Sequence, residues 1–328
     1  MNQMEEMLQK VLSTGQGAIA CTIVHVDGSA YRKEGAWMFL LEDGTQLGMI
    51  GGGCLENDLR IRAQELFGTG TAMEVIYDLR AEDDLGWGRG IGCNGVITVL
   101  IRDVDKGFRE ALLNVHEEFQ QGRPVHYIQE LKEGYPFVFE TTKTIGKMPL
   151  RPFVCAAGSM SDEKGRRYEQ WLWPRPNLYL IGGGSDARPL ASMAQTVGYA
   201  VHLLDWREAL CHEGFFPNAA SIQIGNVEQM VKDTRFTPYD SVVIMTHHFT
   251  LDQALLQFFA KQELLYLGLL GSKQRTSRLT KGISLTHLQS PIGLSIGAEG
   301  PEEIAVSILA EVIAVRNGVA ACPSLASI

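Results

Sequence analysis

The feature that most constrains the fold of this chain is an apolar run that ends in a glycine loop, LYLIGGGSDA at residues 178–187. It combines a strand with the pattern Gly-x-Gly-x-x-Ala, and Asp205 closes the next apolar run about 23 residues after Gly182, near the spacing of a ribose-binding acid. Such glycines let a phosphate lie against a helix N-terminus. We expect a Rossmann-like unit, with Gly182, Gly184 and Asp205 as candidate nucleotide-binding residues. The alternative is the same scaffold with an empty crevice.

The chain that follows repeats the alternation of strand and helix. Short apolar runs separated by helix-length segments are typical of buried parallel strands. These runs cover residues 178–181, 200–204, 221–224, 241–246 and 264–270. A final helix is signalled by Pro301 at a first position, by Glu302 and Glu303 in the first turn, and by Gly318 after its end. The C-terminal part is therefore predicted to be a Rossmann-like domain with a mostly parallel sheet.

The first hundred residues follow a different pattern, in which short strands alternate with turns. The expected strands are 18–26, 37–41, 47–50, 73–77 and 96–101, and one helix over about 55–67 interrupts them. Residues 106–121 look helical, Gly134-Tyr135-Pro136 reads as a turn, and Pro174 and Pro176 mark a boundary. We predict an α/β protein with an N-terminal α+β domain over 1–105, a middle segment and linker over 106–174, and the Rossmann-like domain over 175–328.

Composition narrows the class of protein. A length of 328 residues suits two domains, and a net charge of −9 argues against a nucleic-acid partner. No apolar run approaches the roughly 18 residues that span a membrane, and the N-terminus lacks the pattern of a signal peptide. The six cysteines form no CxxC pair, so neither a disulfide framework nor a structural zinc site is indicated. We expect a cytoplasmic location.

A second glycine loop, GMIGGGCLE at residues 48–56, places Cys54 where the loop turns into a helix. Backbone N–H groups of Gly51, Gly52 and Gly53 could approach a ligand there, and the helix dipole lowers the pKa of a thiol. An anion, a soft metal centre or an electrophile would suit such a site. The alternative is a tight turn in which Cys54 is a small buried hydrophobic residue.

A second cysteine, Cys93, lies in another glycine-dense loop with the sequence GCNG at residues 92–95. If folding brings Cys54 and Cys93 together, the two thiols could ligate a soft metal, form a redox pair or hold a sulfur-containing ligand.

Three further segments lie in loops next to apolar strands or before the last helix, and they are candidates for ligand binding. Gly271, Ser272 and Lys273 form a possible phosphate site, although such charges usually solvate a helix face. His247 precedes Asp252 by five residues, a spacing that we interpret as a hydrogen-bonded structural pair, since no third metal ligand is evident. Residues 291–298, PIGLSIGA, are a small-residue loop before the last helix, and loops at strand ends bind ligands in α/β folds.

Taken together, these motifs resemble the XdhC/CoxI family, the xanthine dehydrogenase accessory factors. The segments that carry the resemblance are GMIGGGCLE, GCNG, YLIGGG, THHFTLD, YLGLLGSKQRTSRL and PIGLSIGAEGPEEIAVSILAEVIA. They lie in residues 15–102 and 177–316, and the stretch from Gly268 to Ala314 is the most specific. Cys54 and Cys93 match the two cysteine motifs of the family, and His247, Asp252, Gly271, Ser272 and Glu303 match its C-terminal signatures.

The resemblance implies a protein that binds the molybdenum cofactor, or molybdopterin, supports its maturation, and delivers it to a molybdenum hydroxylase such as xanthine dehydrogenase. Such a protein is more a chaperone than an enzyme. The implied partners also include a cysteine desulfurase, and a homodimer is the expected assembly. The cofactor has a phosphate and a dithiolene-bound metal, so it needs an anion cradle and suits a thiolate such as Cys54.

Two positions depart from the family pattern, and two other functions stay open. Ser185 stands where the family has a histidine, and Ser295 stands where it has an aspartate. One alternative is an oxidoreductase that binds NAD(P) through Gly182, Gly184 and Asp205, with His247 as the proton donor. The other is a regulator that senses a nucleotide.

Overall fold

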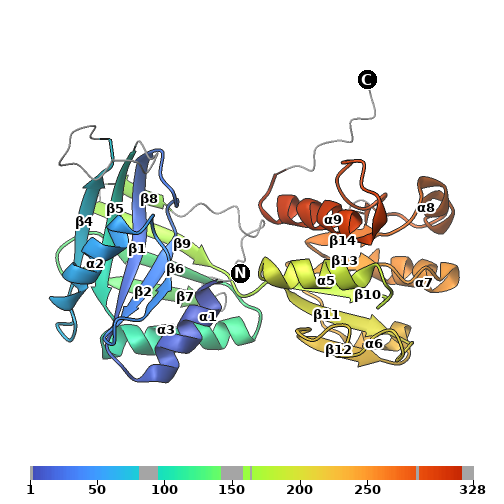
Figure 1. The fold of residues 1–328 in the computed structure, drawn as a ribbon, viewed down its shortest axis with the longest axis horizontal. Coiled ribbons are helices and arrows are strands. Elements are labelled where there is room, and N and C mark those ends of the chain that lie inside the picture. The colour runs from blue at the N-terminus through green and yellow to red at the C-terminus, as the bar shows by residue number, and fades with distance from the viewer. Residues whose placement is uncertain (1–2, 81–94, 142–157, 163–164, 286–287, 320–328) are drawn as a thin grey trace. The chain divides into compact units, whose positions relative to one another are not determined.

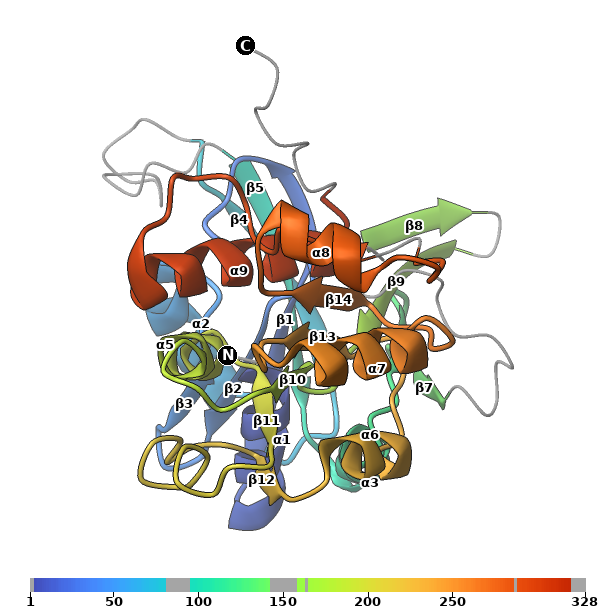
Figure 2. The ribbon, with the colours of Figure 1, turned by 90° about the vertical axis from the view of Figure 1, so that its right-hand side faces the viewer.

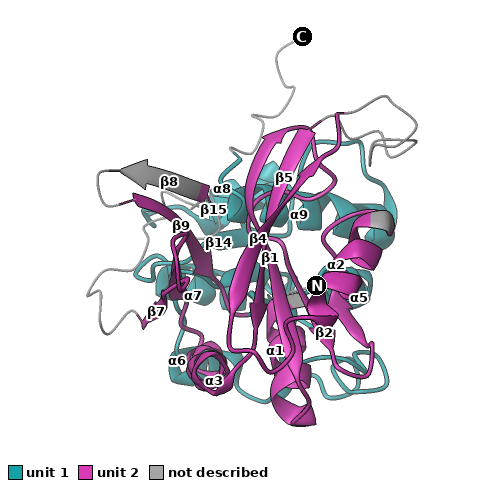
Figure 3. Cartoon of the chain, turned by 90° about the vertical axis from the view of Figure 1, so that its left-hand side faces the viewer, with its two compact units in different colours: residues 1–2, 151–154, 175–328 teal, residues 3–150, 155–174 magenta. Residues whose placement is uncertain are grey.

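The computed structural model describes residues 3–80, 95–141, 158–162, 165–285 and 288–319. These residues fall into two compact units (Figures 1 and 3). The N-terminal unit is formed by described residues between Gln3 and Pro174, and the C-terminal unit by those from Arg175 onward.

The N-terminal unit holds two antiparallel sheets, with strand orders β3-β2-β1-β5-β4 and β7-β6-β9-β8. The strands of the first sheet are β1 (Ala18–Gly28), β2 (Trp37–Leu41), β3 (Gln46–Gly48), β4 (Ala72–Asp78) and β5 (Gly95–Asp103). Those of the second are β6 (Val125–Glu130), β7 (Phe137–Thr141), β8 (Gly158–Asp162) and β9 (Gly165–Leu172). The described helices are α1 (Gln3–Thr14), α2 (Cys54–Gln64) and α3 (Lys106–Gln120).

The five-stranded sheet is buried on both faces, which explains why its central strands are apolar at consecutive positions. Along β1, Ile19 and Cys21 join a core with Leu59 of α2, whereas Ala18 and Ala20 face a second core. Side chains alternate between the faces of a strand, so one continuous apolar run serves both layers.

The described part of residues 106–174 adds α3 and the four-stranded sheet to this same unit. Phe108, Tyr127 and Tyr168 share a core with Leu8 of α1 and Trp37 of β2. The second sheet is also joined to the first by hydrogen bonds, because Trp37 Nε1 donates to Gln170 Oε1 at 2.7 Å. Residues before and after position 105 therefore form one body.

The C-terminal unit is a six-stranded sheet whose neighbouring strands all run parallel, in the order β12-β11-β10-β13-β14-β15. The strands are β10 (Asn177–Ile181), β11 (Ala200–Asp205), β12 (Ser221–Ile224), β13 (Ser241–Ile244), β14 (Tyr266–Leu269) and β15 (Leu288–Gln289). This order is that of a doubly wound Rossmann fold. The predicted fold class is thus confirmed for both parts of the chain.

Helices cover both faces of the parallel sheet (Figure 2). The first face packs against α5 (Ala187–Thr196) and α9 (Gly300–Arg316), and the second against α6 (Val227–Asp233), α7 (Phe249–Phe259) and α8 (Lys273–Leu279). The predicted last helix is α9, with Pro301 in its first turn. Because helices cover both faces of the sheet, a ligand can reach it only at the ends of the strands.

A neutral histidine sits in the C-terminal unit beside the start of β10. His202 Nδ1 lies 2.8 Å from Ser221 Oγ and Nε2 lies 3.3 Å from Asn177 Oδ1. Burial, with a smaller contribution from Arg175, lowers the pKa of His202 to about 4. The folded protein therefore resists protonation of this ring.

We predict that acid destabilises the protein through His202. Below pH 6.5, the pKa of His202 in the unfolded chain, this ring is protonated in the unfolded chain, whereas in the folded chain it stays neutral until about pH 4. The free energy of unfolding should therefore fall by about 1.4 kcal/mol per pH unit across this window. Urea unfolding of the full chain at several pH values measures this, with His202→Gln as the comparison. An equal slope in both proteins would contradict the assignment.

Candidate functional site

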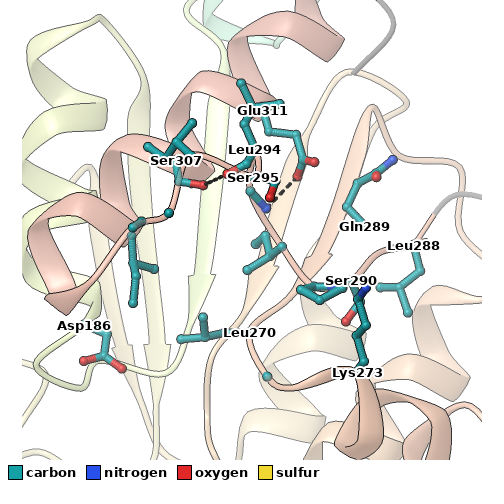
Figure 4. Close-up of a pocket in the computed structure, with 18 of the residues that line it drawn as sticks. Asp186, Leu270, Lys273, Leu288, Gln289, Ser290, Leu294, Ser295, Ser307 and Glu311 are labelled. Atoms are coloured by element: carbon teal, nitrogen blue, oxygen red, sulfur yellow. Dashed lines mark hydrogen bonds between the residues drawn. The ribbon is translucent and has the colours of Figure 1, made fainter. Parts of the chain in front are cut away.

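A cavity of about 800 Å³ lies at the carboxyl edge of the parallel sheet (Figure 4). Its walls come from the segments that follow β10, β13 and β14, from β15 and the loop after it, and from α9. The lining residues are Asp186, His247, Leu270, Gly271, Lys273, 288–298, Ile304, Ser307 and Glu311. Open α/β sheets bind ligands at this edge, where the strand order reverses.

The strand order reverses between β10 and β13, and the segment after each of these strands contributes a side chain to the cavity wall. Asp186 follows β10 and His247 follows β13, and His247 Nε2 lies 3.2 Å from Asp186 Oδ2. His247 has a positive φ of 59°, a backbone conformation that is uncommon for a residue with a side chain and is often found at functional sites. Its side chain is 58% exposed, so it can reach a ligand.

Lys273 supplies a cation to the cavity. No described carboxylate lies within ion-pair distance of its ammonium group. The two acidic residues in the wall are engaged elsewhere: Asp186 with His247, and Glu311 with the Tyr266 hydroxyl and the Gly293 N–H. Lys273 is therefore available for an anionic group.

The loop after β15 is fastened to α9. A Cβ at Gly293 would lie 2.4 Å from Ser307 Oγ, and Gly293 has a φ of +91°. Ser307 Oγ donates a hydrogen bond of 2.6 Å to the Leu294 carbonyl (Figure 4). Glycine is thus required where the loop approaches the helix most closely. Ser295, one of the departures from the family pattern, lies in this loop and lines the cavity.

The carboxylate of Asp205 is fully buried and bonded within the protein. It accepts from the Gly183 N–H, and the guanidinium of Arg207 contacts both oxygens at 2.9 and 2.7 Å. Burial opposes the charged form, but the hydrogen bonds and charge of Arg207 outweigh it, so the pKa of Asp205 lies below its usual range. The sequence predicted that Asp205 binds a ribose hydroxyl. In the structure, both oxygens of this carboxylate are already hydrogen-bonded to the protein.

The glycine loop after β10 is closely packed on both sides. A Cβ at Gly182 would lie 2.5 Å from the Met245 carbonyl oxygen, and one at Gly183 would lie 2.8 Å from Cys211 Cβ. Gly182 has a φ of +115°. Gly184 has no neighbour within 4 Å of such a Cβ. Gly182 thus serves the packing of β10 against β13, and Gly184 leaves open space.

In the N-terminal unit, the second glycine loop is closed by Glu56, a residue that its motif did not single out. The Glu56 carboxylate accepts hydrogen bonds from the backbone N–H groups of Ile50 (3.2 Å), Gly51 (2.6 Å) and Gly53 (2.7 Å). The residue is only 4% exposed. A glutamate three residues after a helix-capping residue is the capping-box pattern, so the signal was present in the sequence.

Glu56 changes what the glycine loop offers to a ligand. Three of the N–H groups that we expected to cradle an anion already bind this carboxylate. Cys54 is the first residue of α2. The glycines of the loop line a depression together with Tyr31, Gln46, Met49, Glu56 and Asn57. Cys93 lies outside the described residues, so the pairing of Cys54 with Cys93 stays a prediction.

Two other cysteines are buried within the cores. Burial raises the pKa of the Cys21 thiol, and it raises the pKa of Cys211 to about 11. Both thiols therefore stay protonated and shielded, and neither suits metal or redox chemistry.

The expected pairing of His247 with Asp252 is wrong. Asp252 is fully buried and accepts from Thr246 Oγ1 and from Arg275 Nη2, whereas His247 contacts Asp186. Ser272, the other member of the predicted phosphate site, caps α8 through Arg275 N. Of Gly271, Ser272 and Lys273, the first and third line the cavity.

Two kinds of feature are absent from the described residues. They contain no group of three or more His, Cys, Asp or Glu side chains that could hold a metal ion. They also contain no helix whose length and apolar character would let it cross a membrane.

A doubly wound sheet with a cavity at its reversal point places the C-terminal unit in the Rossmann class. The chain belongs to the XdhC and CoxI family. Residues 11–78 match the family model of that description, and residues 178–312 match the model of the XdhC Rossmann domain.

Named relatives cover almost the whole chain. A Bacillus subtilis protein named as a probable subunit of xanthine dehydrogenase is 38% identical over 98% of this chain and 99% of the relative. The molybdenum cofactor insertion chaperone PaoD of Escherichia coli is 29% identical over 94% of this chain and 86% of its own length. A crystal structure described as a xanthine dehydrogenase of Bacillus halodurans is 38% identical and covers 96% of both chains, with a TM-score of 0.83.

We predict that Glu56→Ala destabilises the N-terminal unit. The substitution leaves three backbone N–H groups without their charged acceptor, which costs about 3 kcal/mol. Thermal unfolding of the full chain measures the loss. Glu65→Ala, at an exposed position just after the same helix, is the matched control and should leave the melting temperature within about 1 °C. Equal effects of the two substitutions would contradict the role of Glu56.

Proposed function

We propose that this protein binds the molybdenum cofactor, supports its maturation and delivers it to a molybdenum hydroxylase such as xanthine dehydrogenase. The observation that carries the proposal is family membership over both units, together with a relative that is named as a molybdenum cofactor insertion chaperone. A cysteine desulfurase as sulfur donor and assembly as a homodimer belong to the same proposal.

The C-terminal cavity supports the binding of a phosphate-bearing pterin. Its volume of about 800 Å³ falls in the range of small-molecule and cofactor sites. Lys273 offers a positive group and the His247 ring a hydrogen-bonding group, and the exposed hydroxyl of Ser295 lies in the same wall. Phosphate oxygens are recognised by such charged and hydroxyl donors. We assign the phosphate end of the cofactor to this cavity.

Cys54 is proposed as the thiol that faces the metal. Molybdenum in the cofactor is bound by dithiolene sulfur, and soft thiolate ligands suit such a centre. Glu56 already occupies three N–H groups of the loop, so the N-terminal loop is suited to a metal contact more than to a phosphate. Cys93 remains a second thiol candidate.

The geometry does not favour the nicotinamide alternative. A dinucleotide of that type needs an acid at the end of the second strand for its ribose and free N–H groups on the glycine loop. Here Asp205 is buried and binds both Gly183 N and Arg207. We therefore favour the chaperone function over NAD(P) binding and over nucleotide sensing.

The first measurement is the molybdenum and pterin content of protein purified anaerobically from cells that make the cofactor. We predict near-stoichiometric cofactor in the wild type and loss of at least nine-tenths of it, on the order of 1.4 kcal/mol or more in binding, in Cys54→Ala. Cys54→Ser is the matched control for size, and it should fail equally because its hydroxyl is a poor ligand for a soft metal. Full retention by either variant would remove this thiol from the mechanism.

We predict that Lys273→Met weakens binding of the cofactor about tenfold or more, since a hydrogen bond to a charged group contributes about 1.5–3 kcal/mol. The probe is molybdenum cofactor released from a purified molybdenum enzyme, and excess inorganic phosphate should compete with it. Lys281→Met removes the same charge from an exposed position outside the cavity wall and should bind like the wild type. Equal affinities of all three proteins would contradict the assignment of the phosphate.

A further inference from the structure

Three side chains outside the cavity lining connect the segment after β13 with the first turns of α7 and α8. Thr246, two residues after β13, is 2% exposed, and its hydroxyl donates to Asp252 Oδ1 in the first turn of α7. The second oxygen of Asp252 accepts from Arg275 Nη2 of α8 at 2.6 Å. None of the three belongs to the residues that line the cavity.

One end of this network fixes the backbone that carries His247. The Thr246 hydroxyl donates to Asp252 and also accepts from the N–H of His248 at 3.0 Å. His247 lies between these two anchored residues, with its left-handed φ of 59°. Because an isolated residue with a side chain disfavours that conformation, the surrounding contacts must hold it. The turn directs the imidazole toward Asp186 across the reversal point.

The other end of the network fixes the segment that carries Lys273. Arg275 lies in the same short helix, two residues after Lys273, and its side chain is 24% exposed. A Cβ on Gly271 would lie 3.5 Å from Arg275 Nη1 and Cδ, so the strand end packs against the arginine side chain. Movement of Arg275 would therefore displace both Gly271 and Lys273 in the cavity wall.

The ion pair at the centre makes the connection rigid. The Asp252 side chain is 1% exposed, and a buried carboxylate requires a hydrogen-bonded cation in a defined place. Asp252 contacts one group from each neighbouring element, and removal of either group leaves part of its charge without a partner. The segments that carry His247 and Lys273 in the cavity wall are thus tied to one buried carboxylate.

We propose that Thr246, Asp252 and Arg275 are positioning residues that set His247 and Lys273 in the geometry the cavity needs to bind the phosphate end of its ligand. The proposal rests on the proposed function for the identity of that ligand. The positioning itself is a property of the chain and can be measured without the cofactor.

The ligand-free test is amide hydrogen exchange in the full chain. Thr246→Val should accelerate exchange in the segment 270–276, and Arg275→Met should accelerate it in the segment 245–249, by about tenfold in each case. Each effect appears in an element that the substitution does not touch, so local loss of one hydrogen bond does not explain it. Thr246→Ser keeps the hydroxyl and should restore the wild-type pattern.

The binding test is a double-mutant cycle with released molybdenum cofactor as the probe. Thr246→Val and Arg275→Met should each raise Kd about tenfold, and the double variant should raise it far less than a hundredfold, because both changes disable one network. Arg278→Met, in the same helix and on its exposed side, removes the same charge and should bind like the wild type. Since Arg275→Met could unfold the unit, Thr246→Val with its Thr246→Ser control decides the result in that case.

The outcomes separate this proposal from the proposed function. If the wild type binds the cofactor and Thr246→Val and Arg275→Met bind it with unchanged Kd, the positioning role is overturned and the chaperone function stands. The same conclusion follows if the double variant raises Kd by the full hundredfold expected of independent residues. A wild type that binds no cofactor overturns the proposed function, and the exchange experiment then decides the positioning role. Exchange confined to the mutated element overturns that role whatever the cofactor does.

Discussion

The C-terminal unit depends on the close passage of two backbones at Gly182. The chain leaves β10 with a φ of +115°, and any Cβ there would meet the Met245 carbonyl at 2.5 Å. This contact lets β10 and β13 lie side by side in register while their following segments turn apart to opposite faces of the sheet. The cavity, the Asp186–His247 contact and the buried Asp252 network all lie at the edge that this contact creates.

Buried carboxylates of the protein accept hydrogen bonds from several of the N–H and guanidinium groups that could otherwise bind an anionic ligand. Glu56 binds three N–H groups of the N-terminal glycine loop, Asp205 binds Gly183 in the glycine loop after β10 and also Arg207, and Asp252 binds Arg275. Buried carboxylates of this kind make a loop rigid but remove it as an anion site. What remains exposed to a ligand is a smaller set, Lys273, His247 and Ser295 of the cavity wall. This internal pairing explains why glycine loops alone indicated more anion sites than the structure supports.

Rigid support also characterises the N-terminal unit. Two antiparallel sheets share one core with α1 and α3, and buried amides join them. Gln129 is fully buried and accepts from Arg102 and from the Tyr127 hydroxyl, and Gln170 accepts from Trp37 and Tyr168. Each of these amides thus has a partner from the facing sheet or its own strand. The loop that carries Cys54 is therefore built on a fixed platform.

Local pattern was sufficient for most of the elements. The apolar runs at 18–26, 178–181 and 200–204 became β1, β10 and β11, because strand formation and burial depend on the residues of each segment and on their period. The run at 47–50 shows the limit, since it was expected as a strand and β3 ends at Gly48. There the backbone takes a φ of +83°, and the N–H of Ile50 turns to Glu56.

The amino-acid order thus decided the doubly wound sheet, the proline in the first turn of α9, and the place of Cys54 as the first residue of α2, since these follow from periodicity and capping within short windows. Tertiary structure alone decided which charged groups are free. Asp252 pairs with Arg275, 23 positions away, and Asp205 bonds to Gly183, 22 positions away. These two partners are set by the packing of distant elements, and no local spacing encodes them, whereas Arg207 and the capping carboxylate of Glu56 find partners within their own segments.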